Sequence, residues 1–224
     1  QPQRRLLPAQ AVPVTMRGLF ISLEGGEGAG KSTLLAGLRD HLVGQGVDLV
    51  QTREPGGTPL GEALRAILLD PAMRGMSAES ELLMMFASRA QLVRECIAPA
   101  LDAGQWVLCD RFADASYAYQ GGGRGQPMER IAALEAWACA GITPDLTLLL
   151  DLPVADGRAR AAGRGEADRI ESEADAFFER VRDTYRARAA AEPQRFRVLD
   201  ASATPERVLA AAIAAVSPLL ERGR

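Results

Sequence analysis

The sequence predicts a three-layer α/β domain in which helices flank a five-stranded parallel sheet. Five short apolar runs alternate along the chain with longer stretches of helical periodicity, an order typical of α/β folds. Within the apolar runs, polar residues do not alternate with apolar ones, as expected of strands buried on both faces of a parallel sheet. The length of 224 residues, 47% of them apolar, suits one domain, or one domain with a lid.

The sheet is predicted from five runs: Leu19–Leu23, Leu49–Val50, Trp106–Cys109, Leu146–Leu150 and Phe196–Leu199. Acidic residues directly follow three of them, at Glu24, Asp110 and Asp151. Because α/β folds bind ligands beyond the carboxyl ends of parallel strands, we expect functional side chains at these positions.

Six helices are predicted around the strands: Lys31–Gln45, Pro59–Leu69, Ser77–Asp102, Pro127–Ala140, Asp175–Ala191 and Pro205–Leu220. Their ends carry the usual signals. Thr58 and Thr204 are caps, each followed by a proline at the first helical position, and glycine lies just beyond several carboxyl ends, at Gly46, Gly104 and Gly141.

The first fifteen residues do not share these patterns. They contain three prolines and lack the apolar core of a signal peptide. Met16 has the look of a natural start, so we expect residues 1–15 to be a disordered extension or a tag remnant. Residues 16–224 are then a single domain.

Composition excludes several classes of protein. The net charge of -3 gives no sign of a nucleic-acid partner, and no apolar run reaches the ~18 residues that span a bilayer. Because the chain has a single histidine, His41, histidine metal cages are excluded, and so are Ser-His-Asp triads unless His41 acts alone. The chain has no asparagine, which excludes the guanine-reading motif of GTPases and the catalytic loop of protein kinases. Three cysteines without metal or redox spacing indicate buried thiols in a reducing cytoplasm: Cys96, Cys109 and Cys139.

A phosphate-binding loop follows the first strand. Residues 25–32 read GGEGAGKS and fit the pattern G-x-x-x-x-G-K-[ST], with a strand before and a helix after. Glycines let backbone N–H groups face phosphate oxygens, Lys31 reaches the β- and γ-phosphates, and Ser32 joins a Mg²⁺ shell. Lys31 is the only lysine of the chain. The expected ATP-binding residues are Gly25, Gly26, Glu27, Gly28, Ala29, Gly30, Lys31, Ser32 and Thr33.

Further charged residues follow the second and third strands. Asp110 can hold Mg²⁺ through water, and Arg111 can bind a phosphate with two hydrogen bonds. Glu54 and Pro55 belong to a fixed REPGG loop. In the long third helix, the spacing of Phe86 and Arg89 places ring and guanidinium on one face. Taken singly, Phe86 is interpreted as a core side chain and Arg89 as a charge exposed to solvent.

Five segments follow one another along the chain: EGGEGAGKS, TREPGGTPLGEALR, LCDRFADASYAYQGGGRG, ITPDLTLLLDLP and RGEADRIE. In this order and spacing they resemble the bacterial thymidylate kinases, and the resemblance spans Arg17 to Arg222. REPGG and DRF…YAYQG are diagnostic, whereas the phosphate loop is shared with many families. The resemblance implies the P-loop nucleoside-monophosphate kinase fold and the reaction ATP + dTMP = ADP + dTDP in dTTP biosynthesis, with Mg²⁺. It also implies a cytoplasmic homodimer.

Site residues carry over position by position. The expected dTMP site comprises Glu27, Glu54, Pro55, Arg65, Phe86, Arg89, Arg111, Ser116, Tyr119 and Gln120, of which all but Phe86 are implied by the resemblance. Within it, Glu27 approaches the sugar 3′-hydroxyl, Arg65 and Arg111 hold the acceptor phosphate, and Arg89 meets thymine. Ser32 and Asp110 are the implied metal residues, and the implied catalytic residues are Lys31, Asp110, Arg111 and Arg164.

Two positions depart from the family pattern. The ring over thymine commonly lies at the position of Met85 here, and we favour its neighbour Phe86, with Met85 as a thioether contact. Some members carry a catalytic arginine in the phosphate loop, where this chain has Gly28. We therefore expect an arginine-rich lid over about residues 157–169, with Arg164 acting on the phosphoryl group and Arg160 second in line.

Two rival functions remain at this stage. A deoxynucleoside kinase of the same fold would need a base near a sugar hydroxyl, and Glu27 or Glu54 could serve. A P-loop ATPase or switch would need a motif that positions water, and we find none. The pair Arg65 and Arg111 argues for an acceptor that already bears a phosphate.

Overall fold

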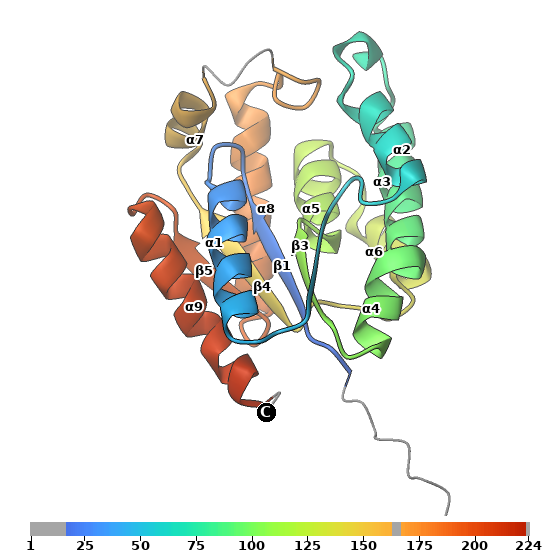
Figure 1. Cartoon of the computed structure of the whole chain (residues 1–224). Helices are drawn as coiled ribbons and strands as arrows, with labels where there is room; N and C mark the ends of the chain where they lie inside the picture. The colour runs from blue at the N-terminus through green and yellow to red at the C-terminus, as the bar shows by residue number, and fades with distance from the viewer. Residues whose placement is uncertain (1–16, 163–166, 223–224) are drawn as a thin grey trace, which may run out of the picture.

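The computed structural model describes residues 17–162 and 167–222. Its centre is one parallel sheet of five strands in the order β2-β3-β1-β4-β5 (Figure 1). The strands are β1 (Phe20–Gly25), β2 (Leu49–Arg53), β3 (Trp106–Asp110), β4 (Leu146–Asp151) and β5 (Phe196–Asp200). The predicted α/β class and five parallel strands are confirmed.

Strand β2 runs further than its apolar residues. Its polar end pairs with β3, Thr52 with Cys109 and Arg53 with Asp110. Ladder hydrogen bonds are backbone bonds, so the partner strand, rather than the apolar run, sets where a strand ends.

Helices cover both faces of the sheet. Helices α1 (Lys31–Gly44) and α9 (Pro205–Arg222) lie side by side on one face and enclose a core with alternate residues of β1 such as Ile21 and Leu23 (Figure 1). The opposite face carries α3 (Ala78–Leu92), α4 (Ala98–Asp102) and α8 (Asp175–Ala191). The period-two alternation of each strand divides its side chains between these two cores.

The predicted helix Ser77–Asp102 is helical over most of its length but not uniform. Between α3 and α4, residues Val93–Ile97 form a π-helical turn. Pro99 follows this turn. Because proline has no N–H, an α-helix would lose one backbone hydrogen bond here, and the wider π-helical turn accommodates that loss.

Three other predicted helices are present with nearly the expected bounds, namely α2 (Pro59–Leu69), α6 (Met128–Cys139) and α8. Short elements were not predicted: η1 (Pro71–Met73), α5 (Ala113–Ser116), the π-helical η3 (Tyr117–Gly123) and α7 (Val154–Ala161). The glycines at the end of η3, Gly121–Gly123, are residues typical of turns, so the sequence pattern did not predict a helix there. They serve close packing, because a Cβ at Gly122 would lie 2.8 Å from the Arg180 carbonyl oxygen of α8.

Two sequence predictions fall partly outside the described residues. The extension 1–15 lies outside them, and so does Arg164. The first part of the expected lid, residues 157–161, belongs to α7. Of the helices that the structure describes, none is long and apolar enough to cross a membrane.

The strand order brings three loops together. Because β3 lies between β2 and β1, the residues after all three strands meet at one edge of the sheet. Asp110 is level with Arg53 of β2 and Leu23 of β1. The phosphate loop, the REPGG loop and the Asp110–Arg111 segment therefore share the crevice that the sequence predicts.

Candidate active site

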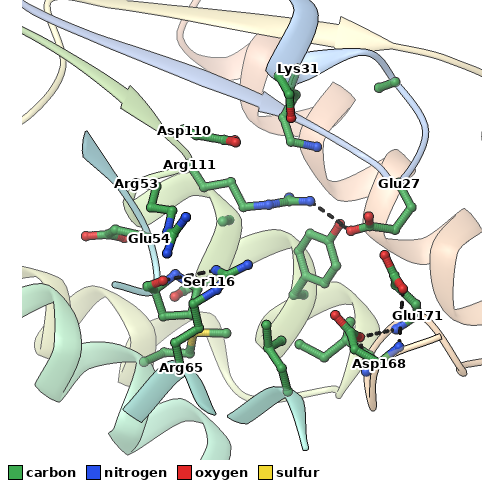
Figure 2. Close-up of a pocket in the computed structure, with 18 of the residues that line it drawn as sticks. Glu27, Lys31, Arg53, Glu54, Arg65, Asp110, Arg111, Ser116, Asp168 and Glu171 are labelled. Atoms are coloured by element: carbon green, nitrogen blue, oxygen red, sulfur yellow. Dashed lines mark hydrogen bonds and ion pairs between the residues drawn. The ribbon is translucent and has the colours of Figure 1, made fainter. Parts of the chain in front are cut away.

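A pocket of about 420 Å³ opens at this edge of the sheet (Figure 2). Most of the predicted site residues line it: Glu27, Gly28, Ala29, Gly30, Lys31, Ser32, Thr33, Glu54, Pro55, Arg65, Arg89, Asp110, Arg111, Ser116, Tyr119 and Gln120. Gly25 and Gly26 instead line a small cavity behind the phosphate loop. One pocket thus holds both the predicted donor site and the predicted acceptor site.

Lys31 begins helix α1 at the pocket wall. Its Nζ donates to the carbonyl oxygens of Gly25, at 3.1 Å, and Gly26, at 2.9 Å, so the ammonium folds over its own loop. Burial, with the neighbouring Arg111, lowers the pKa of Lys31 to about 8. The carboxylates of Glu27, Asp110 and Glu24 oppose this lowering, and a polyphosphate in the loop would add further negative charge beside the ammonium.

Arg111 projects from the end of β3 toward the phosphate loop (Figure 2). Its Nη2 donates to Glu27 Oε1 at 2.9 Å and its Nη1 to the Gly25 carbonyl oxygen at 2.9 Å. The guanidinium lies over the ring of Tyr119, 4.8 Å from the centroid. Its backbone φ is 70°, a strained value for a residue with a Cβ that costs about 1–3 kcal/mol and is concentrated at functional sites.

A second arginine lies across the pocket on α2. Arg65 donates to the Pro55 carbonyl oxygen at 3.0 Å, next to a cis Glu54–Pro55 peptide. Burial lowers the pKa of Arg65, and the like charge of Arg53 lowers it further. An anion bound among these arginines would relieve that repulsion.

One wall of the pocket is a buried ion pair. Arg89 Nε donates to Glu54 Oε2 at 2.8 Å, its Nη1 to Ser116 Oγ at 3.0 Å and its Nη2 to the Phe112 carbonyl oxygen at 3.2 Å. Burial raises the pKa of Glu54, while the charge of Arg89 opposes that rise. The contacts fix the guanidinium plane and leave one N–H of Nη1 for a ligand.

The structure corrects the prediction for Phe86. Its ring lies behind the wall, in a core cluster with Leu82, Tyr117 and Ile131, and Arg89 stacks on it at 4.4 Å. The neighbouring Met85 lines the pocket instead. Phe86 shares a helix face with Arg89 as expected, but that face is turned to the core, so the ring supports the arginine.

Asp110 and Ser32 are the residues of this pocket that could hold a metal ion. Asp110 Oδ1 is buried and has no hydrogen-bond partner among the described residues, although a buried carboxylate oxygen normally has one. It shares the pocket with the Ser32 hydroxyl. Oxygen donors of this kind, few in number, fit Mg²⁺ that keeps several waters and binds phosphates.

The lid arginines that are described do not reach the pocket. Arg158 pairs with Asp175 at 3.0 Å, Arg160 donates to the Ala201 carbonyl oxygen at 2.9 Å, and Arg169 is buried with Glu81. Arg160, expected second in line after Arg164, therefore does not line the pocket in this conformation. Asp168 and Glu171 line the pocket opposite Lys31 (Figure 2), and the sequence pattern predicted no role for either residue.

Comparisons with known proteins agree with this geometry. The family model described as thymidylate kinase matches residues 23–212. The thymidylate kinase of Pseudomonas entomophila is 57% identical over 210 residues, covering 93% of this chain and 100% of its own length. That of Alkalilimnicola ehrlichii is 56% identical, covering 92% and 95%, and that of Halorhodospira halophila is 53% identical, covering 94% and 99%. The chain belongs to the thymidylate kinase family.

Proposed function

We propose that this chain transfers the γ-phosphoryl group of ATP to dTMP, giving ADP and dTDP, as an enzyme of dTTP biosynthesis. Family membership supports the reaction. The observation that carries it is the single pocket in which a phosphate loop faces the arginines Arg65 and Arg111 and the buried wall of Arg89. A simple ATPase has no use for a second phosphate site beside the first.

The donor nucleotide binds at the phosphate loop in this proposal. Backbone N–H groups at the start of α1 receive the phosphates, helped by the positive end of the helix dipole. Ser32 and Asp110 would hold Mg²⁺, which when bound offsets phosphate charge and orients the donor. Lys31 swings from its carbonyl partners to the β- and γ-phosphates.

The acceptor is held at the other side of the pocket. Arg65 and Arg111 bind the dTMP phosphate, and Glu27, held by Arg111 and Tyr119, faces the 3′-hydroxyl. The base lies against Met85, Arg89, Ser116 and Gln120. An acceptor that already carries a phosphate is ionised at neutral pH, so its oxygen attacks in line and no general base is needed.

The chain's own residues therefore contribute by position and charge. Two nucleotides held end to end gain from proximity, and the arginines and Lys31 stabilise charge that shifts during transfer. We assign the remaining positive charge to Arg164, which lies outside the described residues. Lid closure would exclude water and so suppress ATP hydrolysis.

An activity panel tests the function. ADP release is measured with Mg-ATP and each of dTMP, dUMP, dCMP, dGMP and AMP. We expect dTMP to give the highest kcat/KM. The kcat/KM of dUMP should be lower by a factor that corresponds to ~1–3 kcal/mol of binding free energy, because dUMP lacks the methyl group. ADP release without any monophosphate at the rate seen with dTMP would contradict the proposal.

A homodimer in the cytoplasm completes the proposal. Exposed apolar side chains on the packed helices α3 and α6 support a subunit interface: Leu83 is 58% and Trp137 77% exposed. Free Cys96, Cys109 and Cys139 support a reducing compartment. Sedimentation of the wild type and of Trp137→Arg, which should shift toward monomer, tests the interface.

A further inference from the structure

A buried carboxylate lies behind the base wall of the pocket. Glu81, in the first turn of α3, is only 1% exposed. Three side chains from distant segments surround it: Gln120 of η3, Arg124 just after η3, and Arg169. A charge buried this deeply needs partners, and Glu81 has them on both of its oxygens.

The two oxygens of Glu81 share Arg124 and differ in their closest partner. Oε1 accepts from Gln120 Nε2 at 2.8 Å and from Arg124 Nε at 3.3 Å. Oε2 lies 2.7 Å from Arg169 Nη2 and 3.2 Å from Arg124 Nε. Although burial alone would raise the pKa of Glu81, the hydrogen bond from Gln120 and the two arginines outweigh it and lower that pKa. Glu81 is therefore an anion, and it can only accept hydrogen bonds.

This charge state fixes the orientation of the Gln120 amide. An amide carries a donor end and an acceptor end, and only the donor end can face a carboxylate. Because Nε2 is turned to Glu81, Oε1 is the end of Gln120 left for the pocket that it lines. No donor of the described residues reaches Gln120 Oε1.

An acceptor at this position distinguishes pyrimidines. The N3 atom of thymine or uracil carries a hydrogen and donates, whereas the N3 atom of cytosine is an acceptor. A carbonyl oxygen that faces N3 would accept a hydrogen bond from thymine or uracil. With cytosine, this oxygen would instead face the N3 acceptor, and two unpaired acceptors opposite each other are costly in a buried site.

We propose that Glu81 is a positioning residue that holds the Gln120 carbonyl toward the base and so selects thymine and uracil against cytosine. The inference rests on the proposed function, since it requires that a pyrimidine monophosphate bind beside Gln120. Glu81 acts through Gln120 and does not itself touch the substrate.

Substitution of Glu81 by glutamine tests this role. The Glu81→Gln side chain has one carbonyl oxygen and one NH₂ group in place of the two carboxylate oxygens. Because arginine side chains can only donate, we expect Arg124 and Arg169 to hydrogen-bond the carbonyl oxygen. The new NH₂ group then faces Gln120, which must turn its own carbonyl inward and present NH₂ to the base. We expect the ratio of kcat/KM for dTMP to that for dCMP to fall at least tenfold. The ratio for dTMP to dUMP should stay within about twofold, because both bases carry the N3 hydrogen.

Two comparisons separate positioning from general damage. Glu79→Gln is a matched control on the same helix, since Glu79 accepts from Gln126 Nε2 at 3.2 Å and Gln126 does not line the pocket. It should leave all ratios unchanged. In a Gln120→Leu background, which itself lowers the dTMP to dCMP ratio, adding Glu81→Gln should change that ratio no further.

The experiment distinguishes a failure of the role assigned to Glu81 from a failure of the proposed function. Failure of the wild type to phosphorylate dTMP overturns the proposed function. If the wild type does so, an unchanged dTMP to dCMP ratio in Glu81→Gln, or an equal fall with and without Gln120, overturns the role of Glu81. Should Glu81→Gln fail to fold, an unchanged ratio in Gln120→Leu alone would overturn the inference.

Discussion

The backbone of Gly28 in the phosphate loop lies directly against that of Gly157 in α7. A Cβ at Gly28 would lie 2.0 Å from the Gly157 carbonyl oxygen, and a Cβ at Gly157 would lie 2.4 Å from the Glu27 carbonyl oxygen. Neither residue can carry a side chain unless the loop and the helix separate. A side chain at position 28, such as the arginine expected in some thymidylate kinases, would meet the backbone of α7.

Gly157→Ala is therefore expected to damage the enzyme although it favours the helix. Alanine in a helix interior normally stabilises by about 0.5–1 kcal/mol relative to glycine. Here the added methyl would push residues 27–28 into the pocket, so we expect a lower Tm and a fall in kcat/KM for ATP of at least tenfold. Thermal unfolding and steady-state kinetics measure both.

Gly44→Ala serves as the control for that variant. Gly44 is the last residue of α1, and no heavy atom lies within 4 Å of a Cβ placed there. Its kinetics should match the wild type. A Gly157→Ala enzyme with higher Tm and normal kinetics would show that the loop and the helix move apart at no cost.

Local patterns in the sequence predicted much of this site. The phosphate loop, the REPGG loop and Asp110–Arg111 each follow a strand, and a parallel sheet brings such positions to one edge whatever the details of packing. The strand order does the rest by placing β3 between β1 and β2. Most of these residues line the pocket as expected, whereas Gly25 and Gly26 line the small cavity behind the loop.

Other features depend on packing that a linear pattern does not contain. The spacing of Phe86 and Arg89 predicted a shared helix face but not which way the face points; it is buried, and Met85 meets the pocket. Glu81 looks like an ordinary acid in the first turn of a helix. Its burial arises only when Arg124 and Arg169, far away in sequence, fold over it.

Lys31 gives a direct readout of the phosphate loop because the chain has no other lysine. With its pKa lowered to about 8, acylation of Lys31 in the free protein should reach half its maximal rate near pH 8. Mg-ATP should suppress that labelling, and Lys31→Ala should abolish transfer. Peptide mapping by mass spectrometry follows the reaction, and the N-terminal amine is the internal control. Equal labelling with and without Mg-ATP would count against the donor site.

The ion pair of Arg89 and Glu54 makes a prediction about stability. Both side chains are nearly inaccessible, and Arg89→Met would leave the Glu54 carboxylate buried without its partner, a loss typically worth about 3–5 kcal/mol. The double variant Arg89→Met/Glu54→Gln should regain much of that loss, because no unpaired charge remains. Urea unfolding of the wild type, both single variants and the double variant measures the coupling. Simple additivity of the two single losses would rule out a strong interaction.

Glu24 predicts how stability changes with pH. It lies at the end of β1, fully buried, and accepts from Tyr185 Oη and the Phe112 N–H, both at 2.7 Å. Burial, with a contribution from Asp114, raises its pKa from 4.5 to about 8. Between those two values the folded state holds a proton that the unfolded chain has lost. The contribution of Glu24 to stability is therefore present below pH 4.5 and is lost as the pH rises toward 8.

Glu24→Gln keeps the shape of the side chain and removes the titration. We expect the free energy of unfolding of the wild type to fall relative to that of the variant as the pH rises from about 5 to 8.5, measured by urea unfolding at several pH values. Glu206→Gln is the control, since Glu206 is exposed and its pKa is lowered, so that it titrates below this range. Parallel curves for the wild type and Glu24→Gln would show that Glu24 is already ionised at neutral pH. In that case the hydrogen bonds from Tyr185 and Phe112, rather than burial, would set its charge.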